Sequence, residues 1–580
     1  MAEITLTIND KEVKGEDGDT ILNVCQKNDI DVPTLCHFDG IPDMGSCRIC
    51  IVEIEGSGRP RISTSCTTPA TDGMIIQTDT EKLRGMRRNV LEFLLSEGNH
   101  HCMYCAASGD CELQDLAYRF GIDYIKMPVT PSEESTHVDS SQRYLVADPN
   151  RCILCYRCVR VCNDMAGNQV LGISNRGSKA QIISDMGENR GESGCVSCGT
   201  CVQVCPTGAI LDRRSAYMGR KTEVDTTKST CLFCSVGCGN EIISRDNYLI
   251  RIEGDWDAEP NKGLLCVLGR FSPLYDECRA RANKPMIRKD DQLQKATWNE
   301  ALNAVAEKLK FTDKDKIGGL VSTHATTETL KLFAKYSDDM GAKNVGCIEG
   351  PISDPPEKGF DLSDLNDADL YVVVGEDLSE GLHQVVGFLI KRNLIERDKR
   401  LVIVNDEETG LIEFADKHLK ISELDKAIEL CKDAENPIVV YNDEAINQVD
   451  KMREELADNA KFFWMPPGIN SRGALAAGLD GEFDPDKASC VYVMACEAGD
   501  ISEELLSKLK KADFVAVQTS YMEPWDEVAD VILPTTIWAE REGTVINMEG
   551  QELKVNKAVD PPKEVKAEAD ILNALAEKIG

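Results

Sequence analysis

The chain has 580 residues, with 99 acidic against 65 basic side chains and a formal net charge of −34. A charge this negative argues against a nucleic-acid or anionic-membrane partner, because both bind through clustered Lys and Arg. At this length we expect roughly four domains. No run approaches about 18 apolar residues, and the N-terminus alternates polar and apolar residues like a strand. We therefore expect a cytoplasmic protein.

Twenty-five cysteines in a chain of this length indicate metal or catalytic thiols, and they argue against a secreted disulfide scaffold. Twenty of them precede residue 267, and 19 of those 20 join one histidine in closely spaced groups. The first 270 residues are therefore predicted to be a metal-binding module. The six remaining cysteines are predicted to be small buried hydrophobic residues: Cys25, Cys278, Cys347, Cys431, Cys490 and Cys496.

The first group lies between segments 4–8 and 51–54, which alternate like half-buried strands, and Thr20 is expected to cap a short helix between them. A structural zinc site is one interpretation, but zinc usually takes two short Cys pairs. One pair flanked by two distant cysteines is typical of a [2Fe-2S] ferredoxin loop, so we expect a β-grasp fold. The predicted ligands are Cys36, Cys47, Cys50 and Cys66.

The second group follows a predicted amphipathic helix over residues 83–95 and consists of Cys102, Cys105 and Cys111. Three thiolates need a fourth ligand to hold a [4Fe-4S] cluster, and imidazole is an acceptable one. His100 or His101 can supply it. A zinc site with three cysteines and one histidine is the alternative.

The third group is an internal repeat, in which the spacing Cys-x₂-Cys-x₂-Cys-x₃-Cys occurs twice. This is the pattern of bacterial two-cluster ferredoxins, in which the fourth cysteine of each run binds the other cluster. The crossed assignment gives one [4Fe-4S] cluster to Cys152, Cys155, Cys158 and Cys205, and the other to Cys195, Cys198, Cys201 and Cys162.

The fourth group has three close cysteines and one distant cysteine, Cys231, Cys234, Cys238 and Cys266. This spacing favours a [4Fe-4S] cluster beneath a small sheet over a zinc site. The prediction totals one [2Fe-2S] and four [4Fe-4S] clusters. The chemistry expected of this half is therefore electron transfer.

After Trp298 the pattern changes to apolar, β-branched runs that alternate with helical segments such as 384–392. Runs this apolar predict strands covered on both faces, and hence a doubly wound parallel α/β domain. Gly375 follows one run and precedes a helix, so it is either a nucleotide phosphate site or an ordinary turn. The six runs are 319–322, 370–375, 401–404, 437–440, 491–494 and 514–517.

Taken in order, the motifs 45–50, 97–100, the double repeat and the fourth cysteine group resemble the large iron–sulfur subunit of respiratory complex I, the NuoG family. They also resemble the related subunits of soluble NAD(P)-linked or electron-bifurcating hydrogenases and of formate dehydrogenases. Segments 298–302, 529–534 and 540–544 are similar to the molybdopterin oxidoreductase fold. The resemblance implies a [2Fe-2S] domain at 1–80, a His-Cys₃ segment at 81–140, a two-cluster ferredoxin at 141–222, a [4Fe-4S] domain at 223–285 and a truncated α/β domain at 286–580.

The chain also departs from the catalytic members of that fold. They carry a cysteine or selenocysteine metal ligand shortly after a segment like 344–346, and in this chain that ligand is expected to be missing. Their lysine two residues after the last cluster cysteine is Leu268 here, and the chain is short for the catalytic type. We therefore expect no molybdopterin. The spacing His100-x-Cys102 resembles the soluble branch, which favours His100 as the ligand.

The resemblance implies a subunit without catalytic residues of its own, in an NAD(P)H-dependent, hydrogenase-type and electron-bifurcating oxidoreductase complex. It would conduct electrons between a NuoF-like flavin and NAD(H)-binding subunit and a second redox partner. A NuoE-like [2Fe-2S] subunit, hydrogenase or other terminal redox subunits, and ferredoxin are the further expected partners. The alternatives are a formate dehydrogenase subunit, a complex I NuoG subunit and a zinc-rich assembly scaffold.

Overall fold

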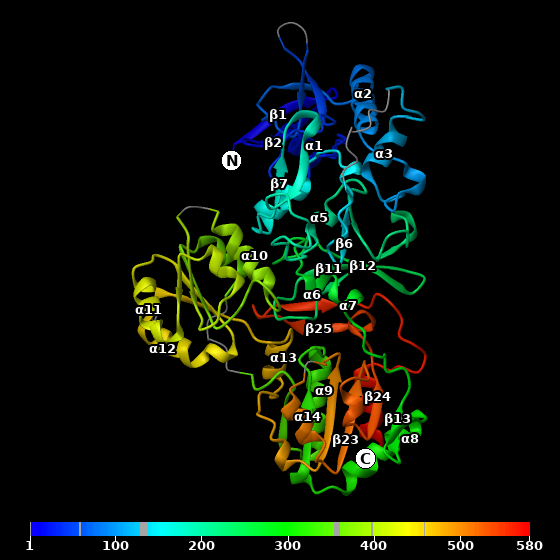
Figure 1. The fold of residues 1–580 in the computed structure, drawn as a ribbon, viewed down its shortest axis with the longest axis vertical. Helices are drawn as coiled ribbons and strands as arrows, with labels where there is room; N and C mark the ends of the chain where they lie inside the picture. The colour runs from blue at the N-terminus through cyan, green and yellow to red at the C-terminus, as the bar shows by residue number, and fades with distance from the viewer. Residues whose placement is uncertain are drawn as a thin grey trace. The chain divides into compact units, whose positions relative to one another are not determined.

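The computed structural model describes residues 2–56, 60–127, 137–352, 360–395, 398–456, 459–499 and 501–579. The chain forms two compact units, Met1–Val224 and Asp225–Gly580 (Figure 1). Within the described ranges, no helix has both the length and the apolar character needed to cross a bilayer.

The first unit begins with a five-stranded mixed sheet in the order β2-β1-β5-β3-β4, with β1 antiparallel to β2 and parallel to β5. Ile4, Leu6 and Ile8 of β1 are buried, as their alternation predicts. The Thr20 hydroxyl accepts the amide of Asn23 and caps α1, which confirms the expected helix start. The elements are β1 (Glu3–Ile8), β2 (Lys11–Glu16), α1 (Ile21–Lys27), β3 (Ile51–Ile54), β4 (Arg61–Thr64) and β5 (Ile75–Gln77).

The rest of this unit has little regular structure besides one long helix, α2, which Thr80 caps and which confirms the predicted amphipathic helix. Two short antiparallel pairs, β6 with β9 and β7 with β8, frame the third cysteine group. The elements are α2 (Glu81–Glu97), α3 (Glu112–Arg119), β6 (Leu145–Ala147), α4 (Arg157–Arg160), β7 (Leu171–Ser174), β8 (Gln181–Ser184), α5 (Thr200–Gln203) and β9 (Ile210–Asp212).

The second unit begins with a three-stranded antiparallel sheet, β10-β11-β12, followed by two short helices. A mixed seven-stranded sheet then runs in the order β14-β13-β24-β23-β22-β15-β16. The elements up to β16 are β10 (Asp225–Thr230), β11 (Gly239–Arg245), β12 (Tyr248–Gly254), α6 (Val267–Arg270), α7 (Ser272–Tyr275), β13 (Met286–Lys289), β14 (Gln292–Lys295), α8 (Trp298–Phe311), β15 (Ile317–Val321), α9 (Thr327–Met340) and β16 (Asn344–Cys347).

A separate five-stranded parallel sheet, β19-β18-β17-β20-β21, is inserted between β16 and β22. Its elements are β17 (Leu370–Val374), α10 (Gln384–Asn393), β18 (Arg400–Val404), β19 (Lys417–Leu419), α11 (Leu424–Lys432), β20 (Pro437–Tyr441), α12 (Ile446–Leu456) and β21 (Lys461–Trp464). The helix that follows, α13 (Ser471–Ala476), packs against α9 and β25 (Gly543–Ile546). The chain then returns to the seven-stranded sheet with β22 (Cys490–Cys496), α14 (Glu503–Leu509), β23 (Phe514–Thr519) and β24 (Val531–Pro534). It ends with an antiparallel pair, β25 and β26 (Glu552–Val555), and the helix α15 (Glu568–Ile579).

The six predicted strands therefore exist within an α/β unit, and they are divided between two sheets. β15, β22 and β23 belong to the seven-stranded sheet, whereas β17, β18 and β20 belong to the five-stranded one. Their composition does not predict which sheet each strand joins, because a strand buried on both faces is equally apolar in either sheet. The central strand β22 shows this burial, since every one of its residues is buried.

Candidate iron–sulfur sites

The first cysteine group lies on the loops beside the five-stranded sheet, and all four side chains are buried. The Cys50 and Cys66 thiols are hydrogen-bonded at 3.3 Å, and this bond lowers the pKa of Cys50 to about 6. Cys36 bonds both Cys47 and Cys66, which lowers the pKa of Cys36 and raises the pKa values of Cys47 and Cys66. The structure thus brings together all four predicted ligands. Thiolate is the form that binds iron.

The loop that carries Cys47 and Cys50 depends on residues in left-handed backbone and on a buried arginine. Gly45 and Arg48 have φ angles of 62° and 60°. The Arg87 guanidinium, with only 1% of the residue exposed, donates to the carbonyls of Ile49 at 3.0 Å and Ile51 at 2.7 Å. These bonds fix the backbone on both sides of Cys50. No sequence pattern indicates this role of Arg87, because it lies on α2, far from the cysteines in the chain.

The second cysteine group surrounds a cavity of about 210 Å³ whose lining includes His100, Cys102, Cys105 and Cys111. The Nε2 atom of His100 is buried and has no hydrogen-bond partner. Burial lowers the pKa of His100 to about 4, so the imidazole is neutral, which is the metal-binding form. His101, by contrast, is exposed.

Two glycines bring the backbone close to these ligands. A Cβ at Gly98 would lie 2.7 Å from the His100 Nε2 atom, and one at Gly208 would lie 2.9 Å from the Cys105 sulfur. Arg151 donates to the same sulfur through Nη1 at 2.6 Å. Because N–H donors to ligand sulfurs change the electronic properties of a cluster, Arg151 belongs to the site. It directly precedes Cys152, which is the only sequence signal for it.

The third group shows the crossed arrangement that the repeat predicts. Cys162 lines a cavity of about 20 Å³ together with Cys195, Cys198 and Cys201. Burial, together with the nearby Cys205, raises the pKa values of Cys152, Cys155 and Cys158. The structure therefore brings each fourth cysteine to the other run, and ligation by these two sets stays a prediction.

The two runs also share their backbone conformation. Leu154 and Tyr156 in the first run have positive φ angles of 52° and 61°, and the equivalent Ser197 and Gly199 in the second have 57° and 71°. Three of these residues are not glycine, and left-handed backbone is unfavourable for them. Its presence at matching positions indicates that both loops are shaped by the same requirement, namely to turn successive cysteines toward one centre.

A buried arginine connects the first and third groups. The Arg160 guanidinium, in a residue that is 5% exposed, bonds the carbonyls of Cys36, Pro42 and Cys155, the last two at 2.6 and 3.4 Å. Cys36 and Cys155 belong to different predicted clusters. Arg160 therefore holds two ligand loops against each other, a role that its position between Cys158 and Cys162 did not suggest.

The fourth group lies beside the β10-β11-β12 sheet, as expected, and Cys231, Cys234, Cys238 and Cys266 are all buried. Burial raises the pKa values of the first three, and Cys266 lies close enough to raise them further. A Cβ at Gly269 would lie 3.2 Å from the Cys231 sulfur. His383, which is 2% exposed, bonds the hydroxyl of Ser235 at 2.8 Å beside Cys234.

These residues fit iron–sulfur clusters by the chemistry of their donors: buried or half-buried thiols in fours, or three thiols and a neutral imidazole with an unpartnered nitrogen. Among the described residues, no three His, Cys, Asp or Glu side chains are grouped for a single metal ion. In a [4Fe-4S] cluster each thiolate binds its own iron atom, so the ligands surround a space.

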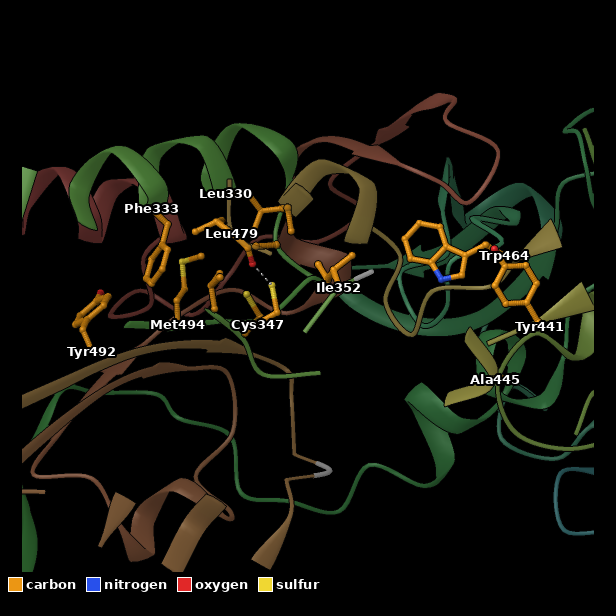
Figure 2. Close-up of a cluster of buried hydrophobic side chains, with 14 of the residues drawn as sticks. Leu330, Phe333, Cys347, Ile352, Tyr441, Ala445, Trp464, Leu479, Tyr492 and Met494 are labelled. Atoms are coloured by element: carbon orange, nitrogen blue, oxygen red, sulfur yellow. Dashed lines mark hydrogen bonds between the residues drawn. The ribbon is translucent and has the colours of Figure 1, made fainter. Parts of the chain in front are cut away.

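Of the six cysteines outside the groups, five are buried as predicted, and the prediction for Cys278 is wrong, since it is exposed. It lies just after α7, where its neighbours Glu277 and Arg279 bond each other and leave the thiol outside. Figure 2 shows Cys347 in the hydrophobic core beside Leu330 and Met494, with its thiol donating to the Leu479 carbonyl at 3.4 Å.

Two motifs of the second unit have their polar groups bonded within the protein. The Gly375 amide donates to the Val404 carbonyl, which supports the ordinary-turn interpretation of this residue. The Arg541 guanidinium, in a residue that is 3% exposed, bonds the carboxylates of Glu497 and Glu568 at 3.0 and 2.8 Å. These are buried charges that satisfy one another.

Family models match most of the chain. The molybdopterin oxidoreductase model matches residues 281–578, which is more than half of the chain, and the molybdopterin oxidoreductase Fe4S4 domain matches 224–275. Three further matches are a 2Fe-2S iron-sulfur cluster binding domain at 1–81, the NADH-ubiquinone oxidoreductase-G iron-sulfur binding region at 87–126 and the NADH-quinone oxidoreductase subunit 3 ferredoxin-like domain at 144–211. The chain belongs to the molybdopterin oxidoreductase family, and within it to the NuoG-like proteins that carry these iron–sulfur domains.

Several relatives are oxidoreductase subunits. The NuoG-type subunit of the NADH-quinone oxidoreductase of Rickettsia bellii is 28% identical over 99% of this chain and 86% of its own length. The NADPH-Fe(3+) oxidoreductase subunit alpha of Geobacter sulfurreducens is 32% identical over 72% of this chain, which spans about half the length of that relative. Among solved structures, an NAD+-reducing [NiFe]-hydrogenase is 33% identical over 38% of this chain and 91% of its own, with a TM-score of 0.35.

The histidine next to the second group provides a direct test of its ligand set. We expect His100→Ala to lose the spectroscopic signal of the second cluster, because it removes the unpartnered nitrogen that lines the cavity. The exposed His101→Ala is the matched control and should retain it. Electron paramagnetic resonance of the reduced proteins measures both. The opposite pattern, with the signal lost only in His101→Ala, would make the assignment wrong.

Proposed function

We propose that this chain is a non-catalytic, cytoplasmic electron-transfer subunit of an NAD(P)H-dependent oxidoreductase complex. It conducts electrons one at a time between a flavin-bearing subunit that reacts with NAD(P)H and a second redox partner. The observation that carries the proposal is the crossing of Cys162 and Cys205 between the two cysteine runs. Two interleaved sets of four thiols suit a pair of neighbouring [4Fe-4S] clusters, which supply electron transfer and no substrate chemistry.

The proposed cofactors are one [2Fe-2S] cluster and four [4Fe-4S] clusters. The gathering of the predicted ligands in each group supports this number, and the neutral, buried His100 supports its place in the second group. Clusters with different ligands have different potentials, since imidazole in place of thiolate raises the potential. A subunit with such a set can pass electrons over a long distance in short steps.

The hydrogenase-type branch is the favoured assignment within this function, including electron bifurcation. The spacing His100-x-Cys102 and the retention of both complete cysteine runs support it. The proposed partners are a NuoF-like flavin and NAD(H)-binding subunit, a NuoE-like [2Fe-2S] subunit, and a hydrogenase or other terminal redox subunit, with ferredoxin as a further partner.

A second candidate is the NuoG subunit of an NADH-quinone oxidoreductase. The length of the match to the Rickettsia bellii protein supports it, since it covers 99% of this chain and 86% of the relative. Both candidates use the chain for electron transfer and differ in the terminal partner. Purifying the native complex and identifying its other subunits distinguishes them, because only one contains a hydrogenase subunit.

We further propose that the second unit binds no molybdopterin. Leu268 occupies the position of the lysine that bridges cluster and pterin in catalytic relatives of this fold, and it is half-buried at the start of α6. Cys347, the cysteine nearest to the expected metal-ligand position, lies in the hydrophobic core. The Arg541 charge is already paired with Glu497 and Glu568. Cys347 and Arg541 therefore have structural partners within the protein, which supports the proposal.

Metal analysis of the protein purified without oxygen tests the cofactors. We expect about 18 iron atoms per chain, since one cluster contributes two and four clusters contribute four each. Molybdenum and tungsten should be below a tenth of an atom per chain. A stoichiometric amount of either metal would contradict the pterin-free proposal and favour a formate dehydrogenase.

Reduction of the native complex by NAD(P)H tests the electron-transfer function. In the wild type, NAD(P)H should reduce the clusters of this chain and then the terminal partner. In Cys205→Ser, reduction of the terminal partner should fall at least tenfold while flavin reduction persists, because hydride transfer to the flavin needs no cluster. The matched control is Cys25→Ser, a buried cysteine outside the groups. If Cys205→Ser kept wild-type rates, the paired clusters would not lie on the route.

A further inference from the structure

A buried arginine, Arg190, faces the cysteine set that contains Cys162. It lies in the loop after β8 and is 4% exposed. Its Nη1 atom donates to the Cys201 sulfur at 3.7 Å, which is within the range of an N–H···S hydrogen bond. Arg190 also lines the same cavity of about 20 Å³ as the four thiols of this set, Cys162, Cys195, Cys198 and Cys201.

The guanidinium of Arg190 has few other partners. Among the described residues, the guanidinium bonds the Cys201 sulfur and no carboxylate, and its Nε atom is buried without a hydrogen-bond partner. Asp139 accepts the backbone amide of Arg190 at 2.7 Å and interacts with its charge from a half-buried position. Arg157, beside the other set, differs because both of its terminal nitrogens bond the Glu112 carboxylate, at 2.6 and 2.9 Å.

A buried cation without an ion-pair partner is costly, and the cost is offset only by a nearby negative charge. The four thiols at this cavity supply that charge once they hold a cluster, because a [4Fe-4S] cluster with four thiolates is an anion. Its negative charge grows by one on reduction. A fixed positive charge at a buried site therefore stabilises the reduced form more than the oxidised form.

We infer that the positive charge of Arg190 raises the reduction potential of the cluster held by Cys162, Cys195, Cys198 and Cys201. The inference rests on the proposed function, since it requires a cluster at these four thiols. The positive charge makes this cluster easier to reduce than its cysteine ligands alone would make it.

Redox titration followed by electron paramagnetic resonance tests the inference on the full chain with its clusters. In Arg190→Gln we expect the reduced-to-oxidised ratio of this cluster to fall at least tenfold at a fixed ambient potential, which for one electron corresponds to 59 mV. Arg190→Lys keeps the charge and should stay within threefold of the wild type. Thr200→Val removes a neutral donor to Cys198, 3.6 Å away, and should change the ratio less than Arg190→Gln does.

A second variant keeps the test decisive if Arg190→Gln loses the cluster. Asp139→Asn keeps one oxygen that can accept the Arg190 amide, gives up the two bonds that Ser141 donates to the other oxygen, and removes the negative charge that opposes the guanidinium. We expect it to raise the ratio at least threefold. An unchanged potential in Arg190→Gln with its cluster intact, or in Asp139→Asn, would overturn the inference. A wild-type protein without a cluster at these thiols would instead contradict the proposed function, and iron analysis separates the two failures.

Discussion

The exchange of two cysteines between neighbouring loops is the constraint on which the first unit depends. Cys162 belongs by sequence to the first run but lines a cavity with Cys195, Cys198 and Cys201, while Cys205 lies near the cysteines of the first run. In the proposed crossed ligation, neither loop completes its set of four ligands without the other, so the two halves of the repeat must fold together. The left-handed backbone at equivalent positions of both runs follows from the same requirement.

Buried arginines offset the negative charge that iron–sulfur clusters would add to an already acidic chain. The chain carries a net charge of −34, and each thiolate-bound cluster adds negative charge at a buried position. Arg87, Arg160 and Arg190 are each at most 5% exposed, and they bond carbonyls or a sulfur of the cysteine loops. Cations at these places offset the charge where it is buried, whereas a lysine or arginine on the predominantly acidic surface is screened by solvent. The same arrangement leaves individual arginines available to adjust individual potentials.

The structure brings the cysteines of each predicted group together, because cysteine spacing is a local property: a short run that can hold a cluster shows it in its residue numbers. The choice between His100 and His101 is less local, since it depends on which imidazole is buried. The arginines were missed because Arg87 reaches its loop from a helix distant in the chain. The division of the six predicted strands between two sheets could not be predicted, because burial on both faces gives strands of either sheet the same composition. Cys278 was misassigned because the pairing of its neighbours is not visible as a pattern.

An iron-edge anomalous diffraction map of the intact protein, prepared without oxygen, shows whether the two cysteine runs exchange their last members to hold two clusters. We expect two separate iron peaks in the 141–222 segment, one surrounded by Cys152, Cys155, Cys158 and Cys205 and the other by Cys195, Cys198, Cys201 and Cys162. A single peak in this segment, or a peak bound by Cys152, Cys155, Cys158 and Cys162 alone, would contradict this exchange.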